Sequence, residues 1–277
     1  MKFIHMSDIH FTRPGEEMEG IDPHQRFDLA LKHCEAQHPD AARIVITGDL
    51  AHWGETGAYQ ALKNRIEASR LPIRLLLGNH DDRSNFLGVF GEHPRDANGY
   101  INHQETVGEF QFIYCDTNEP GTHAGYFGPD RLATLGRMLE EATRPVVLFM
   151  HHNPVPTGIV PVDKIGLIYP DSKAITDLLR AHRAKVRHIF FGHIHMAVSG
   201  VVAGIPYSAV RSTVHQALPD FSEPEWLLGG QFEPNYSVVT LKGDMTNIIH
   251  VPFAYDGPVR RSGTAWNDWA KPEAMEA

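Results

Sequence analysis

Seven residues with metal-binding side chains stand in short polar motifs, each of which follows an apolar run. They are Asp8, His10, Asp49, Asn79, His151, His193 and His195. The set offers carboxylate, amide and imidazole ligands and no thiolate, and such ligands suit Mn, Fe, Co or Zn. Two ions held ~3.5–4 Å apart can lower the pKa of a bound water from ~15.7 to about 7, which produces a hydroxide nucleophile. The residues therefore predict a dinuclear, hydrolytic metal centre.

The strands that precede the motifs must bring them together. Short apolar runs bounded by turn residues are typical of buried parallel strands. We expect such strands at Lys2–Met6, Arg43–Thr47, Ile73–Leu77, Val146–Met150 and Val186–Phe191. In an open α/β sheet, ligands bind outside the carboxyl ends of the strands. Five strand ends would therefore deliver the seven side chains to one rim.

Helices are predicted between these strands. They are expected over Pro23–Gln37, Thr56–Ala68, Pro129–Ala142 and Ser172–His182, with a short segment at Asp82–Phe90. Asp22 is placed to cap the first helix, which has a proline at its first position. This alternation of strand and helix is typical of an α/β fold.

Antiparallel strands are expected as well. Tyr100–His103 and Phe110–Cys115 resemble the two arms of a hairpin, and Val201–Ile205, Ser237–Leu241 and Asn247–Val251 are expected to form an antiparallel sheet. The predicted fold class is therefore α/β, with two mixed β-sheets packed face to face and flanked by helices.

Composition limits the classes of function. The 277 residues carry a formal charge of −9 with no basic run, whereas a nucleic-acid binder normally needs a stripe of Lys and Arg. A nucleic-acid polymer is therefore disfavoured as a partner. No apolar stretch approaches the ~20 residues of a membrane helix, and we see no signal peptide. Cys34 and Cys115 cannot form a disulfide scaffold. We expect a cytoplasmic protein with no membrane partner.

The spacing within the motifs indicates how ligands could be shared. Asp8 and His10 stand two residues apart on an extended segment, so both can reach one ion. His193 and His195 repeat this spacing, although their side chains can serve different ions. Asp49 has a short side chain at a strand end, which suits a carboxylate that bridges the two ions.

Together, the motifs resemble the signature of the calcineurin-like metallophosphoesterases over roughly residues 1–200. The motifs that carry the resemblance are Asp8-x-His10, Gly48-Asp49, Gly78-Asn79-His80-Asp81, His151-His152 and Gly192-His193-x-His195. The resemblance implies a four-layer sandwich. It also implies one metal site of Asp8, His10, Asp49 and His195, and a second of Asp49, Asn79, His151 and His193.

Finer features narrow the resemblance. The chain has His52 where the protein phosphatases of this family have an aspartate, and its third motif ends in Asp81 where they have a glutamate. These departures argue against a protein phosphatase. The segments 79–82 and 212–216 look more like the bacterial branch of class III cyclic-nucleotide phosphodiesterases and glycerophosphodiesterases.

Four further residues are candidates for catalysis or substrate binding. His80 follows a ligand and should project into the site, where it could contact the phosphoryl oxygens or protonate the leaving group. Asp81 either orients His80 or caps the following helix. The family match places His215 on the phosphate, the alternative being a surface histidine at a strand end. His52 could hydrogen-bond a substrate group, and His152 is expected to have a structural or supporting role.

The predicted function is dinuclear-metal-dependent hydrolysis of a small phosphodiester, either a glycerophosphodiester or a 3′,5′-cyclic nucleotide, by a metal-bound hydroxide. The ions would be divalent or mixed-valence first-row metals. A phosphomonoesterase with the same centre is the main alternative. A non-enzymatic scaffold without metal is disfavoured because all seven ligands are present.

We expect residues 1–253 to form the metallophosphoesterase domain and residues 254–277 a C-terminal tail. The tail carries Trp266 and Trp269, which would dock on the core or on a second subunit. The proline-rich segment Asn153–Pro170 is expected to form a lip over the site, the alternative being an irregular loop. The apolar lip and the tail together favour a homo-oligomer.

Overall fold

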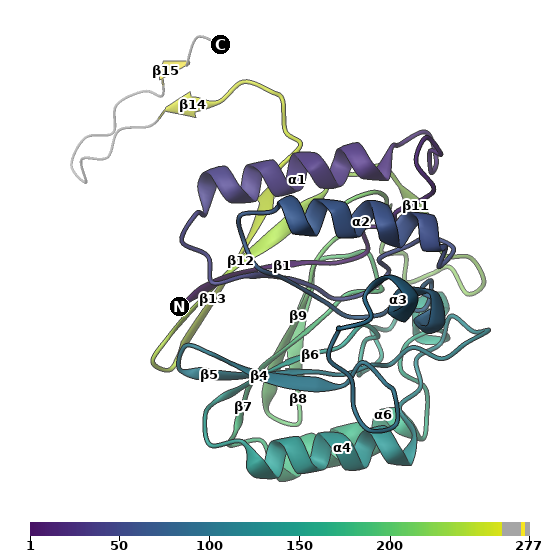
Figure 1. Ribbon diagram of the computed structural model, residues 1–277, viewed down its shortest axis with the longest axis vertical. Coiled ribbons are helices and arrows are strands. Elements are labelled where there is room, and N and C mark those ends of the chain that lie inside the picture. Colours follow the sequence, from purple (N-terminus) through teal and green to yellow (C-terminus); the bar gives the residue numbers. More distant parts are fainter. Residues whose placement is uncertain (262–272, 275–277) are drawn as a thin grey trace.

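Two β-sheets packed face to face form the centre of the protein, and helices cover the outer face of each (Figure 1). The computed structural model describes residues 1–261 and 273–274. The first sheet has the strand order β13-β12-β1-β2-β3. Its strands are β1 (Lys2–Met6), β2 (Ile44–Ile46), β3 (Ile73–Leu75), β12 (Asn235–Lys242) and β13 (Met245–Pro252). Strands β1, β2 and β3 are parallel, β12 lies antiparallel beside β1, and β13 pairs antiparallel with β12.

The second sheet has the order β4-β5-β6-β7-β9-β8. Its strands are β4 (His103–Val107), β5 (Phe110–Tyr114), β6 (Val146–Phe149), β7 (Val186–Phe191), β8 (Val198–Val202) and β9 (Ile205–Ala209). Strands β5, β6, β7 and β9 are parallel, whereas both edge strands are antiparallel to their neighbours. The structure therefore confirms the expected pair of mixed sheets.

Helices complete the four layers. They are α1 (Pro23–Gln37), α2 (Thr56–Ala68), α3 (Arg83–Val89), α4 (Gly128–Glu141), α5 (Val160–Asp163) and α6 (Asp171–Ala181). Figure 1 shows α1 and α2 over the first sheet and α4 and α6 over the second. The carboxylate of Asp22 accepts hydrogen bonds from the amides of His24 and Gln25, so α1 begins as predicted. None of the helices in the described residues is long and apolar enough to span a membrane.

Strand periodicity explains why the layers hold together. Side chains along a strand alternate between its two faces, so Ile4 and Met6 of β1 pack under the helices of the first sheet. Phe3 points the other way and meets Phe112, Phe149 and Phe190 of the second sheet edge to face. These aromatic contacts fill the space between the sheets, and this dry core fixes how the two sets of strand ends face each other.

Two strand predictions are wrong. The partner of β5 is His103–Val107 and not Tyr100–His103. The prediction missed this edge strand because it is polar and lacks the apolar run that a buried strand has. The segment Val201–Ile205 is not one strand. It contains the turn of the β8–β9 hairpin, at Ala203 and Gly204, and this hairpin belongs to the second sheet, whereas β12 and β13 lie in the first.

The C-terminal part of the chain adds short strands. A small sheet pairs β10 (Gln216–Ala217) with β11 (Gly229–Gly230), and another pairs β14 (Arg260–Arg261) with β15 (Glu273–Ala274). The two tryptophans expected to dock, Trp266 and Trp269, lie outside the described residues.

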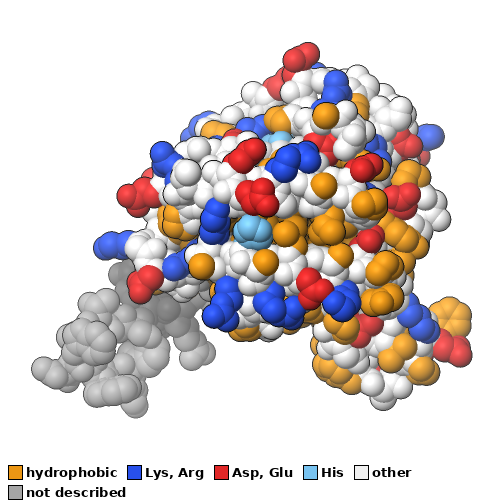
Figure 2. All heavy atoms as spheres, turned by 90° about the horizontal axis from the view of Figure 1, so that it is seen from below, with side chains coloured by type: hydrophobic (Ala, Val, Ile, Leu, Met, Phe, Trp, Pro, Cys, Tyr) orange, Lys and Arg blue, Asp and Glu red, His pale blue; other side chains and the backbone are white. Residues whose placement is uncertain are grey.

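On the lower face of the molecule as drawn in Figure 1, Lys and Arg side chains are mixed with Asp, Glu and apolar side chains (Figure 2).

Candidate metal centre

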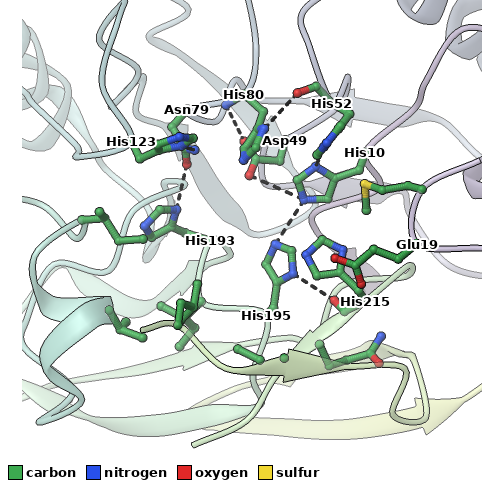
Figure 3. Close-up of a pocket in the computed structure, with 18 of the residues that line it drawn as sticks. His10, Glu19, Asp49, His52, Asn79, His80, His123, His193, His195 and His215 are labelled. Carbon is green, nitrogen blue, oxygen red and sulfur yellow. Dashed lines mark hydrogen bonds and ion pairs between the residues drawn. The ribbon is translucent and has the colours of Figure 1, made fainter. Parts of the chain in front are cut away.

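The loops that leave the carboxyl ends of five parallel strands meet at one cavity. Asp8 and His10 follow β1, Asp49 follows β2, Asn79 follows β3, His151 follows β6, and His193 and His195 follow β7. Figure 3 shows side chains from both sheets converging across this cavity. The structure thus brings all seven predicted ligands together, as parallel strand ends should.

The first cluster contains Asp8, His10, Asp49 and His195, whose ligand atoms all lie within 4.8 Å of one another. The Nε2 atoms of His10 and His195 are 3.1 Å apart. His10 Nε2 lies 3.7 Å from Oδ2 of Asp49, and His195 Nε2 lies 3.4 Å from Oδ1 of Asp8. All four side chains are buried or nearly so.

The second cluster lies on the other side of Asp49. Oδ1 of Asn79 is 3.1 Å from Nε2 of His151 and 2.8 Å from Nδ1 of His193. His151 Nε2 is also 3.4 Å from Oδ1 of Asp49. The two oxygens of Asp49 therefore face different clusters, which is the arrangement a bridging carboxylate requires.

These donor sets fit metal ions. Ligand atoms ~2.0–2.2 Å from one ion, at tetrahedral or octahedral angles, stand about 3.0–3.5 Å from one another. The distances between neighbouring donors in the two clusters fall in or close to this range. A cation would satisfy lone pairs that otherwise face one another in a dry site.

Hydrogen bonds set which nitrogen each imidazole offers. His151 donates from Nδ1 to the carbonyl of Thr47, and His195 donates from Nδ1 to the carbonyl of His215. In both rings Nε2 is left facing the cluster, where it can bind an ion once it has lost any proton. Such outer hydrogen bonds fix the tautomer and orientation of metal-binding histidines.

His152 differs from its neighbour His151. It donates from Nε2 to the carbonyl of His123, and its Nδ1 accepts from the hydroxyl of Thr117. Both of its nitrogens are thus occupied, although the ring lies close to His193. His152 therefore supports the site from behind.

The buried charges need a cation. Burial would raise the pKa of Asp49, but the nearby imidazoles, His151 first, hold that pKa well below its usual value. Burial alone would lower the pKa of His151, yet Asp49 raises it to about 9. In the protein without metal, His151 therefore takes a proton that offsets the carboxylate.

Backbone strain is concentrated here. Asp8, His10, Asp49, His193 and His195 all have positive φ, between 44° and 68°. Residues other than glycine reach this region at a cost of about 1–3 kcal/mol each, and they persist there only when their surroundings over-determine them. The sharp turns let successive side chains reverse toward the cavity from the ends of straight strands.

Two glycines allow the loops to approach closely. A Cβ atom on Gly78 would overlap the carboxylate of Asp49, and one on Gly192 would overlap the hydroxyl of Ser7. Any larger residue at either place would push the loops apart. The glycines before Asn79 and His193 are therefore required by packing.

Asp81 clamps the loops instead of orienting the His80 ring. Its carboxylate accepts hydrogen bonds from the amides of Gly78, Leu50 and Ala51, and from the hydroxyl of Tyr59. The helix cap is Asp82 and not Asp81. Both roles predicted for Asp81 thus differ from its observed contacts, because the sequence does not reveal that the loop around Leu50 lies against it.

His80, His52 and His215 line the same cavity as the ligands. His80 donates its amide to Asp49 Oδ1, and its Nδ1 donates to the carbonyl of His52. The Nδ1 atoms of His52 and His10 are 3.3 Å apart. The His215 ring lies 4.4 Å from that of His195, and its buried Nδ1 has no partner in the described structure.

Sequence reasoning missed other residues of the cavity. His123, whose Nδ1 is 2.8 Å from Nδ2 of Asn79, lies on a loop without a recognisable motif. Glu19 is a second omission (Figure 3). An apolar wall completes the cavity, which has a volume of about 530 Å³. As expected for a lip, the segment Asn153–Pro170 supplies Val162 and Ile165 to this wall.

Known proteins resemble this chain along most of its length. The sequence pattern of calcineurin-like phosphoesterases matches residues 1–197. A probable cyclic nucleotide phosphodiesterase from Rhodopseudomonas palustris is 37% identical over 263 residues, which cover 94% of this chain and 95% of the relative. The 3′,5′-cyclic adenosine monophosphate phosphodiesterase CpdA from Pseudomonas aeruginosa is 27% identical, with 79% of each chain covered. The glycerophosphodiester phosphodiesterase GpdQ from Enterobacter lignolyticus is 27% identical, with 78% of each covered.

Solved structures share the fold at low identity. A purple acid phosphatase from yellow lupin seeds has a TM-score of 0.64 at 12% identity, covering 92% of this chain and 52% of the phosphatase chain. GAP50, the anchor in the inner membrane complex of Plasmodium, has a TM-score of 0.60 at 13% identity, covering 99% of this chain and 88% of its own. These structures share the two-sheet sandwich described above.

Proposed function

The chain belongs to the calcineurin-like phosphoesterase family, and we propose that it hydrolyses small phosphodiesters with two bound metal ions. The observation that carries the proposal is the pair of donor clusters that share Asp49 at the floor of a cavity. Asp8, His10, Asp49 and His195 would hold one ion, and Asp49, Asn79, His151 and His193 the other. The ions would be Mn, Fe, Zn or Co, divalent or mixed-valence, since these metals accept such ligands.

When bound, the ions supply an acidic water that can act as the nucleophile near neutral pH, and they offset charge on the phosphoryl oxygens. The chain's own part is to hold that chemistry in a fixed geometry. The strained turns at Asp8, His10 and Asp49 position two carboxylates and an imidazole before any ligand arrives. Groups that are preorganised in this way need no rearrangement during the reaction.

His80 is the proposed contact with the reacting group. Its amide and its Nδ1 are both hydrogen-bonded, which fixes the ring and leaves Nε2 for the substrate. As an imidazolium, His80 could donate from Nε2 to a phosphoryl oxygen or to the departing alkoxide. His215, with its unpartnered Nδ1, is placed to hydrogen-bond a phosphoryl oxygen from the side of His195. His52 lines the cavity beside His80, so its remaining ring nitrogen could meet a substrate group.

The charge of the cavity favours diesters over monoesters. None of the described residues that line it is Lys or Arg. Arg83 instead makes a bidentate ion pair with buried Asp116, and Arg211 donates to the carbonyl of Glu233. A phosphomonoester carries a further negative charge that such a site would leave without a partner. A phosphodiester carries one negative charge, shared by its two non-bridging oxygen atoms, and the two ions can neutralise it.

The names of the relatives suggest which diesters to test. They include cyclic nucleotide phosphodiesterases and a glycerophosphodiester phosphodiesterase, so both classes are candidates. A scaffold without metal is the non-enzymatic alternative, because a protein named as an anchor shares the fold. The complete ligand set argues against it here. A net charge of −9 argues against a nucleic-acid polymer as substrate.

Three further expectations are part of the proposal. Cys34 and Cys115 are free and buried, as suits the reducing cytoplasm. Residues 1–253 would form the catalytic domain, with residues 254–277 as its tail. The tail and the apolar lip would favour a homo-oligomer, which sedimentation at micromolar concentration would test.

The deciding experiment compares kcat/KM of the manganese-loaded protein on three substrates. They are 3′,5′-cyclic AMP, glycerophosphoethanolamine and 4-nitrophenyl phosphate. We expect one of the diesters to exceed the monoester by a hundredfold or more, which corresponds to about 2.7 kcal/mol of transition-state binding. A monoester that reacts faster would overturn the diester assignment and leave the metal centre in place. No hydrolysis by protein with both ions bound would favour the scaffold.

A further inference from the structure

The cavity has a second half that the metal chemistry does not use. Beside the imidazoles, its wall is apolar and comes from four separate segments. The wall residues are Met18, Val162, Ile165, Ile194, Ala217, Leu227 and Leu228. A phosphate group gains nothing from such a surface, whereas an apolar group attached to it would lose its contact with water there. The wall therefore points to the part of the substrate that lies away from phosphorus.

One charged side chain enters this half. Glu19 lines the cavity, and its carboxylate lies on the side of His215 (Figure 3). None of the ion pairs among the described residues includes Glu19. With no Lys or Arg lining the cavity, Glu19 can act there only as a hydrogen-bond acceptor or as a partner for a cation.

The chain holds Glu19 in this position by a tight turn. Glu19 and Gly20 both have positive φ, 52° and 78°, and Met18 and Ile21 exchange backbone hydrogen bonds of 2.8 and 2.9 Å. Both φ signs match a type I′ hairpin turn, which normally prefers Asn or Gly at the place of Glu19. Met18 and Ile21 pack on Val214, next to His215. Gln231 also donates to the carbonyl of Glu19, which ties the turn to the loop after β11.

We propose that Glu19 selects the substrate by accepting a hydrogen bond from an amino group on the end of the diester that packs against the apolar wall. The inference rests on the proposed function. Glu19 is exposed, so water can replace a missing donor, and the selection comes from the charge-assisted hydrogen bond that an amino group makes and a carbonyl oxygen cannot make. An analogue with a carbonyl oxygen in place of the amino group would also be repelled by the carboxylate.

Two kinds of end group carry such a donor, namely the amino group of a nucleobase and an alkylammonium group. The nucleobase fits the cavity better. Its flat apolar faces would cover the leucine, valine and isoleucine side chains, whereas the two carbons of an ethanolamine leave most of that wall uncovered. A cavity of about 530 Å³ is of the size that accepts a whole nucleotide.

Matched substrates test this selection. Cytosine carries an amino group where uracil carries a carbonyl oxygen, and adenine differs from hypoxanthine in the same way. The experiment measures kcat/KM of the manganese-loaded protein on the 3′,5′-cyclic nucleotides of these four bases, on glycerophosphoethanolamine and on bis(4-nitrophenyl) phosphate. The variants are Glu19→Gln, which keeps the shape and removes the charge, and Glu17→Gln as the matched control. Glu17 is exposed and two residues away, and it does not line the cavity.

The wild-type protein should prefer the amino-bearing base in both pairs by about tenfold or more. Glu19→Gln should reduce each ratio to within about threefold, since an amide can meet either group, and Glu17→Gln should keep the wild-type ratios. Dissociation constants of the 5′-monophosphates of cytidine and uridine, measured by calorimetry, should show the same loss of preference without turnover. Equal rates within both pairs, or ratios that survive Glu19→Gln, would overturn the inference.

The other arms separate this failure from that of the proposed function. Hydrolysis of bis(4-nitrophenyl) phosphate with no preference between paired bases would sink the role of Glu19 alone. If no diester is hydrolysed, both proposals fall. If glycerophosphoethanolamine is the best substrate and only its rate falls in Glu19→Gln, the donor is an ammonium group and the assignment to a nucleobase is wrong.

Discussion

The two halves of the cavity are built in opposite ways. The metal side consists of side chains such as Asp8 and His151, both fully buried, on loops that leave straight parallel strands. The other side consists of Glu19 on an exposed turn and Leu227 on a surface loop, where the leucine is 53% exposed. Chemistry that requires fixed geometry is placed on rigid elements, while the residues proposed to choose the substrate lie on loops that can change without disturbing the sheets.

The largest effect expected from this division follows from the substitution Asp49→Asn. The two oxygens of the Asp49 carboxylate face different donor clusters. Because metal centres supply several kcal/mol of transition-state stabilisation, the substitution should lower kcat at least ~1000-fold. Metal content by mass spectrometry should fall below two ions per chain. The control is Asp40→Asn at the surface, which should keep both ions. Full activity of Asp49→Asn would show that this carboxylate does not bridge.

His80→Ala should have the next largest effect. Because the ring contacts the substrate and not the ions in our proposal, kcat should fall about 100-fold while both ions stay bound. His93→Ala is the comparison, since His93 is a histidine outside the cavity. An unchanged kcat in His80→Ala would remove its role as acid and phosphate contact.

His52→Ala should weaken metal binding, and this effect should be smaller than the losses of kcat expected for Asp49→Asn and His80→Ala. His52 lies against Nδ1 of His10, and the loss of such an outer contact usually weakens metal binding about 10–100-fold. Calorimetric titration with Mn²⁺ measures this directly. An affinity equal to that of the wild type, together with a raised KM, would instead assign His52 to the substrate.

Metal binding should also depend on pH through His151. Asp49 raises the pKa of His151 to about 9 in the metal-free protein, so below that pH the ring carries a proton that must leave before Nε2 can bind an ion. Affinity should therefore rise with pH, up to about tenfold per unit, and level off above pH 9. Calorimetry in buffers of different ionisation enthalpy should show proton release at neutral pH. Binding without proton release would contradict the raised pKa.

The smallest effect is expected on the apolar wall. Leu227→Ala removes a half-exposed side chain and should raise KM by about threefold without changing kcat or metal content. Leu29→Ala, at an exposed position on α1 away from the cavity, serves as the control. A large loss of kcat in Leu227→Ala would mean that the two halves of the cavity do not act separately.

The same division explains what the sequence can predict. Each ligand follows the end of an apolar run, and this position alone is enough to place Asp8, Asp49 and His193 at one rim. Glu19 and His123 cannot be found in this way, because they lie on loops whose paths depend on contacts distant in sequence, such as that of Met18 with Val214. The hydrogen-bond partners of Asp81 escape prediction for the same reason.

Errors in the predicted fold have a related cause. The edge strand β4 is polar in its middle, at Gln104, Glu105 and Thr106, so it lacks the pattern that marks the buried strands. The β8–β9 hairpin resembles a single strand in the sequence because its turn residues, Ala203 and Gly204, lie within an otherwise apolar stretch. Edge strands face solvent on one side, and their sequences are less constrained than those of central strands.

The most direct test of the two-ion centre is to titrate Mn²⁺ into protein stripped of metal while following bound ions and hydrolysis of a diester together. Our account predicts that each chain binds two ions and that hydrolysis reaches its full rate only when both clusters are filled. Saturation at one ion per chain, or hydrolysis at full rate by protein without metal, would contradict it.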